Sequence, residues 1–128
     1  MLSTEWMKVI RPSAATSVIF QALTEMEREP LEVFKLLGQA LAYQALGRSH
    51  DSITALNQLI IKHHQDLAYQ IAEVYAYRGE TDKAFEWLLR AYQQRDGGLL
   101  FVKADPLLRS LHHDPRYADV LRKMRLPT

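Results

Sequence analysis

Cysteine is absent from this chain, which excludes disulfide bonds and thiolate metal sites. Glycine and proline occur only five times each, while frequent alanine, leucine, glutamine and arginine favour helix. The 16 basic and 15 acidic residues nearly cancel, so the chain has no overall field to attract nucleic acid or an anionic membrane. No stretch is long and apolar enough to cross a bilayer, and Glu5 and Lys8 interrupt the start in a way that signal peptides do not. We therefore expect a cytoplasmic protein with no nucleic-acid or membrane partner.

The sequence also lacks the usual signatures of catalysis. It has no phosphate-binding glycine loop and no motif that places a nucleophile beside a base. The adjacent His63 and His64 would point about 100° apart on a helix, which does not suit one metal ion. We expect no catalytic residues, no cofactor and no metal, and the chain is not predicted to be an enzyme.

What the chain does contain is a series of amphipathic helical segments. Apolar side chains follow a spacing of three and four residues in each of them, which is typical of helices that bury one face. The predicted helices cover residues 13–28, 31–46, 50–63, 67–78, 82–94, 106–112 and 115–125. Residues 99–104, between two of them, are predicted to form a loop.

Part of this pattern recurs at one fixed distance along the chain. Tyr43, Gly47, Leu56 and Ile60 correspond to Tyr75, Gly79, Leu88 and Tyr92. A fixed period of this size, with small and aromatic residues in phase, indicates a helical repeat protein. In such a protein each helix pair buries its apolar face against the next pair.

Turn residues support the same helix boundaries. Gly47 and Gly79 are predicted to be left-handed residues that follow a helix, and Thr81 is predicted to cap the next helix. Asp105 and Asp114 each precede a proline, so both are predicted to cap a helix that begins at that proline.

The repeat resembles the tetratricopeptide repeat (TPR). Residues 68–91 match its pattern at Ala68, Ile71, Ala72, Tyr75, Gly79, Ala84, Leu88 and Ala91. Residues 36–59 match at Leu36, Ala40, Tyr43, Gly47, Ser52, Leu56 and Leu59, although Gln39 stands where the family has leucine. Residues 105–125 are similar to the tails of TPR segments that accompany bacterial regulators and adenylyl cyclases.

The resemblance implies an all-α, right-handed α-solenoid of antiparallel helix pairs, with about seven helices. The chain would be one domain, residues 1–128, with a partial repeat at 13–28, repeats at 31–63 and 66–94, and capping helices at 105–125. A second register also fits the helix at 31–46, in which Phe34, Leu37 and Leu41 match the later repeat at a slightly longer period. The residues leave both registers open.

In this family the first helix of each pair lines a concave groove, which implies a partner-binding surface. The groove would take a peptide or protein partner. Its predicted residues are Leu37, Leu41, Gln44, Tyr69, Gln70, Glu73 and Tyr77. The tyrosines have an alternative role, because each could instead pack against neighbouring helices or against residues 99–102. The family's carboxylate-clamp residues are missing, so a clamp of that type is not expected.

The helix at 13–28 suggests a second kind of association. If its partner helix is missing, apolar side chains remain uncovered and a second copy could bind there, which would make the chain a homodimerisation unit. The predicted contacts for this alternative are Trp6, Ile19 and Phe20. The leading prediction remains a protein-interaction module or scaffold, and a small-ligand sensor is the third reading.

Overall fold

The structure is a computed structural model that describes residues 16–27 and 31–126. Every regular element in these ranges is helical, with six α-helices and two 3₁₀-helices, so the predicted all-α class is confirmed. The chain divides into two compact units, residues 1–62 and 63–128.

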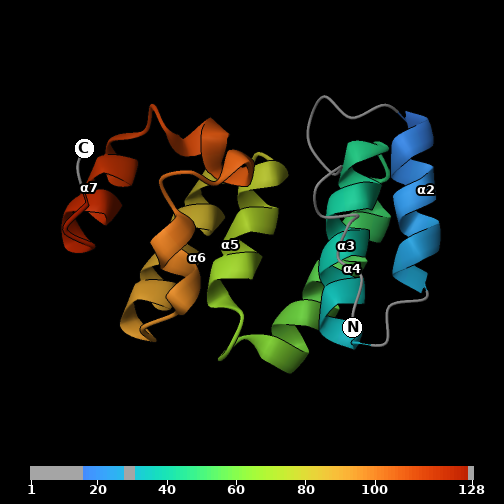
Figure 1. Cartoon of the computed structure of the whole chain (residues 1–128), viewed down its shortest axis with the longest axis horizontal. Helices are drawn as coiled ribbons and strands as arrows, with labels where there is room; N and C mark the ends of the chain where they lie inside the picture. Colours follow the sequence, from blue (N-terminus) through green and yellow to red (C-terminus); the bar gives the residue numbers. More distant parts are fainter. Residues whose placement is uncertain (1–15, 28–30, 127–128) are drawn as a thin grey trace. The chain divides into compact units, whose positions relative to one another are not determined.

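The first unit contains three α-helices, drawn in blue to green in Figure 1. They are α2 (Thr16–Glu27), α3 (Glu32–Ala45) and α4 (Ser49–His63). Helix α2 packs on α3. Between α3 and α4, the Ser52 hydroxyl donates a 2.7 Å hydrogen bond to the Ala40 carbonyl. Ser52 is fully buried, so this bond satisfies a hydroxyl group that would otherwise destabilise the core.

The second unit is organised around one buried helix. Its elements are α5 (Ala68–Tyr77), α6 (Thr81–Gln93), η1 (Gly97–Phe101), η2 (Pro106–Leu111) and α7 (Pro115–Lys123). Helix α5 contacts α6, η1 and η2, and seven of its ten residues are buried. Helix α6 is amphipathic: it buries Ala84, Leu88 and Ala91, spaced four and three residues apart, and exposes much of its other side. Figure 1 shows α5 and α6 side by side, with the η1 and η2 segment returning across them toward α7.

Four helices end with the same hydrogen-bond pattern. After α3, the Gly47 N–H donates to Gln44 O and the Arg48 N–H donates to Tyr43 O. The same two bonds recur after α5, where Gly79 and Glu80 are the donors. Both glycines have φ near +80°, a left-handed conformation that glycine adopts without a steric cost. The predicted role of Gly47 and Gly79 is therefore confirmed.

Helices α6 and α7 end in the same way but without glycine. Arg95 and Arg125 occupy the left-handed position, with φ of 57° and 58°. Asp96 N–H then donates to Ala91 O, and Leu126 N–H donates to Leu121 O. These are Schellman motifs built on arginine, which is an unusual residue for that conformation.

Aspartates begin the last three helical elements, at a regular spacing. Asp96, Asp105 and Asp114 follow one another at equal intervals, and each carboxylate accepts from the backbone N–H two residues later. The predicted caps at Asp105 and Asp114 are confirmed. Thr81 does not cap α6, whose N-cap is Glu80, so that prediction is wrong. The predicted loop at 99–104 is wrong in its first part, which belongs to η1, the 3₁₀-helix that Asp96 caps. The helix predicted at 106–112 is the 3₁₀-helix η2.

Candidate interaction surfaces

Tyr69, predicted as a groove residue, lies in the core of the second unit. Only 3% of it is exposed. Its hydroxyl donates a 2.6 Å hydrogen bond to Asp105, and its backbone N–H donates a 3.0 Å bond to Asp96. The alternative role considered for this tyrosine, packing within the chain, therefore fits its position, and we correct its assignment to the groove.

The neighbours of Tyr69 explain why it is buried. Asp96 and Asp105 are the caps of η1 and η2, so one tyrosine links both 3₁₀-helices to α5. Gly98 also approaches it closely, because a Cβ atom built on Gly98 would lie 2.6 Å from Tyr69 Cδ2. Burial is the main cause that raises the pKa of Tyr69, and its hydrogen bond to Asp105 adds to the effect. Tyr69 therefore stays a neutral hydrogen-bond donor.

Two groove residues predicted on α3 are also buried. Leu37 is 3% exposed and Leu41 is 2% exposed. Both are core residues in the described chain, and we correct their assignment to an open surface. Leu37 and Leu41 are four residues apart on one face of α3, so the burial follows from the helical spacing itself. Gln44, almost one turn further along, is half-buried.

The remaining predicted groove residues form a partly buried polar face on α5. Gln70, Glu73 and Tyr77 are spaced three and four residues apart, which places them on one side of the helix. The side-chain oxygen atoms Gln70 Oε1 and Tyr77 Oη are buried and have no hydrogen-bond partner among residues 16–27 and 31–126. Buried polar atoms are rarely left without a partner, so this face has unused hydrogen-bonding capacity.

The carboxyl group of Glu73 lies between these two unpaired oxygen-bearing side chains along the helix. Burial raises its pKa well above the ordinary value of 4.5, and the nearby Asp105 and Asp96 carboxyl groups raise it further. A carboxyl group in this setting favours its neutral, protonated form. The raised pKa therefore makes Glu73 easier to protonate than an exposed glutamate.

A second surface, which the sequence analysis did not predict, is a recess between α6 and α7. Its volume is about 370 Å³. Five apolar or aromatic residues line it: Phe85, Leu88, Leu89, Tyr92 and Val120. Leu89 is 44% exposed and Tyr92 is 40% exposed, although both are large apolar side chains. We call this site the α6–α7 recess.

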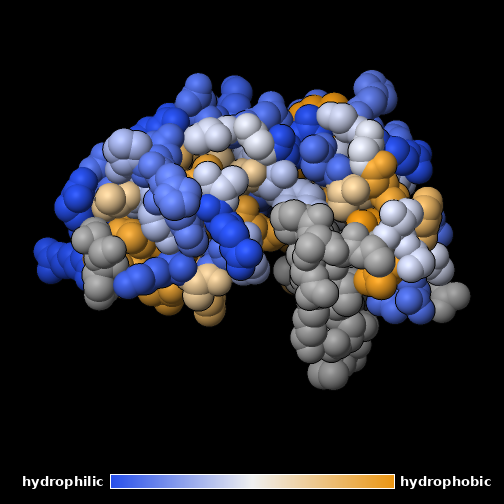
Figure 2. Space-filling view, turned by 90° about the horizontal axis from the view of Figure 1, so that it is seen from above, coloured by the Kyte–Doolittle hydropathy of each residue, from blue (hydrophilic) through white to orange (hydrophobic). Residues whose placement is uncertain are grey.

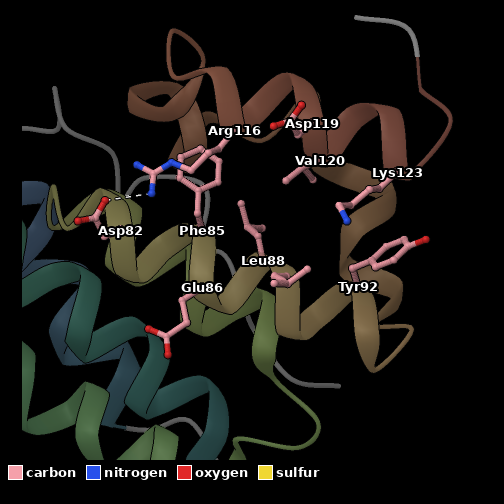
Figure 3. A pocket seen from close by; sticks show the side chains of 10 residues that line it. Asp82, Phe85, Glu86, Leu88, Tyr92, Arg116, Asp119, Val120 and Lys123 are labelled. Atoms are coloured by element: carbon pink, nitrogen blue, oxygen red, sulfur yellow. Dashed lines mark ion pairs between the residues drawn. The ribbon is translucent and has the colours of Figure 1, made fainter.

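Charged side chains mark the two ends of the recess (Figure 3). At one end, Arg116 forms a 3.0 Å ion pair with Asp82, and its guanidinium group lies 4.6 Å from the centre of the Phe85 ring. At the other end, the Lys123 ammonium group lies 5.7 Å from the centre of the Tyr92 ring. Both contacts have the geometry of cation–π interactions. Asp82 and Arg116 lie near the N-termini of α6 and α7, and Tyr92 and Lys123 lie near their C-termini. The two helices therefore run in the same direction along the recess.

Arg116 is held in place from its own helix. Asp114 accepts from Arg116 Nε at 3.0 Å and from Nη2 at 2.9 Å, in addition to capping α7. These hydrogen bonds keep the pKa of the Asp114 carboxyl below its ordinary value. The two-pronged pairing fixes the guanidinium plane, so the Arg116 end of the recess is preformed.

The sequence held a partial signal for this recess. Phe85, Leu89 and Tyr92 are spaced four and three residues apart on α6, which marks a second apolar stripe beside the buried one. Such a stripe is usually covered by a neighbouring helix, and the sequence alone does not show that α7 covers it only in part. Figure 2 shows apolar side chains in several patches among hydrophilic ones on the viewed face.

The residues predicted for self-association have different positions. Ile19 is 2% exposed, so its predicted role as an uncovered contact is corrected: its side chain lies in the core. Phe20 is 54% exposed on α2. Trp6 lies outside the described residues.

Two kinds of site are absent from the part of the chain that the structure describes. In residues 16–27 and 31–126, no group of three histidine or acidic side chains is arranged to hold a metal ion. None of the helices described is both long enough and apolar enough to span a bilayer.

No protein-family model, curated protein or solved structure matches this chain.

Proposed function

We propose that the chain is a protein-interaction module that holds apolar side chains of a partner in the α6–α7 recess. The observation that carries this proposal is the apolar lining of the recess. Charged residues mark its two ends, and the Arg116 end is preformed. Binding sites commonly combine an apolar interior with a few fixed polar groups. The role is non-catalytic, with no cofactor and no metal.

The repeat geometry supports a scaffold of the TPR kind. Gly47 and Gly79, which correspond in the repeat, end their helices with matching hydrogen bonds. Ser52 and Ala84, which also correspond, are both fully buried small residues. We take α3–α4 and α5–α6 as successive helix pairs of an α-solenoid, which is a fold that presents extended surfaces to partners.

A selection experiment tests the α6–α7 recess. Random linear peptides displayed on phage are selected on the wild-type protein and then measured on Leu89→Arg and Val120→Arg, which introduce a long charged side chain into the recess. We expect selected peptides to carry at least two large apolar side chains and to lose at least about tenfold in affinity for both variants. The matched control is Ile61→Arg, at a 74% exposed apolar residue of α4 outside the recess. Peptides that bind all four proteins equally would show that the recess is not the binding surface.

The α5 face is a second candidate surface, favoured by its two unpaired buried oxygen atoms. Both atoms are buried in the free protein, so a peptide main chain pairs with them only if binding uncovers this face. Tyr77→Phe removes the hydroxyl group and keeps the ring. We expect this change to weaken a peptide bound along α5 without lowering stability, because the hydroxyl makes no hydrogen bond within the described part of the chain. Peptides from the selection above that bind Tyr77→Phe as well as wild type do not use this face.

A further inference from the structure

Most of the charged side chains that line the α6–α7 recess are already paired within the chain. The ion pairs that involve them are Asp82–Arg116, Glu86–Lys83 and Asp119–Arg122. The remaining charged lining residue is Lys123, which is exposed. Its ammonium group lies against the Tyr92 ring, and no carboxylate among residues 16–27 and 31–126 pairs with it. The charge that the recess still offers to a partner is therefore positive, and it lies at one end (Figure 3).

Two arginines stand at the ends of the same two helices. Arg95 directly follows the C-cap of α6, and Arg125 directly follows the C-cap of α7. Both are exposed, and neither has a carboxylate partner in the part of the chain that the structure describes. Since α6 and α7 run in the same direction, both arginines belong to the Lys123 end of the recess.

The corresponding ends of α3 and α5 differ in this respect. After α3, Arg48 forms a 2.7 Å ion pair with Asp51, and after α5, Arg78 forms a 2.8 Å ion pair with Glu80. The negative end of a helix dipole favours a basic residue in all four places, so the dipole does not explain why the last two arginines lack a carboxylate. These two also occupy the left-handed position that glycine holds after α3 and α5. Strained positions of this kind often coincide with functional surfaces.

We propose that the α6–α7 recess binds an acidic segment of a partner protein. Large apolar side chains of the segment enter the recess, and its aspartate or glutamate side chains lie against Lys123, Arg95 and Arg125. This inference rests on the proposed function of the recess and names the chemistry of its partner. Opposite charges on the two surfaces would select the partner and fix its orientation.

The two ends of the recess make the expected partner asymmetric. At the other end, the single guanidinium group of Arg116 already pairs with two carboxylates, from Asp82 and Asp114. That end has no spare positive charge, so the acidic residues of the partner should gather on one side of its apolar residues. Three cations spread over two helix ends can meet several carboxylates, which suits a peptide better than a small molecule with one carboxylate.

The test uses the peptides that the selection on the recess yields. Each is synthesised with an amidated C-terminus, in its selected form and in a neutral form with asparagine for aspartate and glutamine for glutamate. Isothermal titration measures both forms at low and high salt on the wild type, on Lys123→Gln and on Arg95→Gln combined with Arg125→Gln. The matched control is Lys103→Gln, at an exposed lysine of the second unit that does not line the recess. Circular dichroism checks that each variant is folded.

We expect the selected peptides to contain more acidic than basic residues, and the wild type to bind the acidic form at least about fivefold more tightly than the neutral form. Lys123→Gln should reduce this preference about two- to fivefold, which is the usual effect of one exposed ion pair, and the double arginine variant should reduce it by at least as much. High salt should reduce it too, because exposed charges are screened. Lys103→Gln should keep the wild-type preference.

Equal binding of the acidic and neutral forms to the wild type would overturn the proposal. So would a preference that Lys123→Gln and the double arginine variant leave at the level of the control. If the peptides still lose affinity on Leu89→Arg in these cases, the proposed function of the recess stands, so the two failures are distinguishable. A selection without any peptide that depends on Leu89 overturns both.

Two other occupants of the recess would also overturn the proposal. A wild-type dimer that Leu89→Arg dissociates, seen by analytical ultracentrifugation, would show that a second copy covers the recess. Binding to phosphatidylserine vesicles that Lys123→Gln weakens, together with equal binding of the two peptide forms, would show that the cations serve an anionic lipid surface.

Discussion

The Tyr69 hydroxyl donates a 2.6 Å hydrogen bond to Asp105, which lies far along the chain and caps η2. The same tyrosine donates its backbone N–H to Asp96, the cap of η1. One residue of α5 thus connects the two 3₁₀-helices that follow α6. The position of the C-terminal segment on α5 depends on this connection, and so does the burial of Tyr69.

Tyr69→Phe tests the connection. The change keeps the ring and leaves a buried oxygen of Asp105 without its donor, so we expect the free energy of unfolding to fall by about 1–3 kcal/mol. Urea denaturation measures the loss. Tyr92→Phe is the matched control, because Tyr92 is 40% exposed and its hydroxyl is not part of the core. Equal stability of the two variants would contradict the proposed role of Tyr69.

Gly98→Ala tests the close approach between Gly98 of η1 and the Tyr69 side chain. A new Cβ would lie within 3 Å of three atoms of Tyr69, whose ring is fixed by its hydrogen bond. We expect a loss of about 1–3 kcal/mol in the free energy of unfolding, as for other overpacked cores. Gly97→Ala is the natural comparison, since a Cβ at that position would meet no described atom within 4 Å other than those of its chain neighbours. If both alanine variants unfold at the same urea concentration, the contact with Tyr69 is unimportant.

Arg95→Gly should stabilise the protein. Arg95 has φ of 57°, where an L-residue with a side chain is strained, and Gly47 and Gly79 occupy the corresponding positions after α3 and α5. We expect a gain of about 0.5–1 kcal/mol, reduced in part by the larger entropy of glycine in the unfolded chain. Thermal unfolding measures the gain. The reverse change, Gly79→Ala, should destabilise by a similar amount, and a destabilising Arg95→Gly would mean that the arginine side chain contributes more than its backbone strain costs.

Glu73→Gln tests the buried carboxyl group through its dependence on pH. The pKa of folded Glu73 lies well above 4.5, so the folded protein binds a proton more tightly than the unfolded chain does. Its contribution to stability is therefore fully present below pH 4.5 and is lost as the pH rises through the folded pKa. Glutamine does not titrate and resembles the protonated form. We expect the variant to gain stability relative to the wild type as the pH rises above 4.5, as measured by urea denaturation at several pH values. A difference that is independent of pH, or one that favours the wild type at high pH, would show that Glu73 is ionised in the folded protein.

The sequence by itself determined where most of the helices begin and end. Gly47 and Gly79 end helices because a left-handed residue is a local requirement, and Asp105 and Asp114 begin them because a carboxylate two residues before an N–H is a local partner. The spacing of apolar residues likewise determined the all-α class, because helical periodicity is a local property of the sequence. The cap at Asp96 was not predicted, although Asp96 precedes Asp105 by the same interval that separates Asp105 from Asp114.

The tertiary structure alone decided which side chains remain open. Tyr69, Gln70 and Tyr77 lie on one short helix, and nothing local shows that residues 96–105 cover Tyr69 while two oxygen atoms of the other side chains are left without partners. The α6–α7 recess has the same origin: α7 meets α6 through Arg116 and Asp82, which are distant in the sequence, and leaves Leu89 and Tyr92 partly uncovered. Helix formation depends on neighbours in the sequence, whereas the open surfaces depend on contacts that only the folded chain brings together.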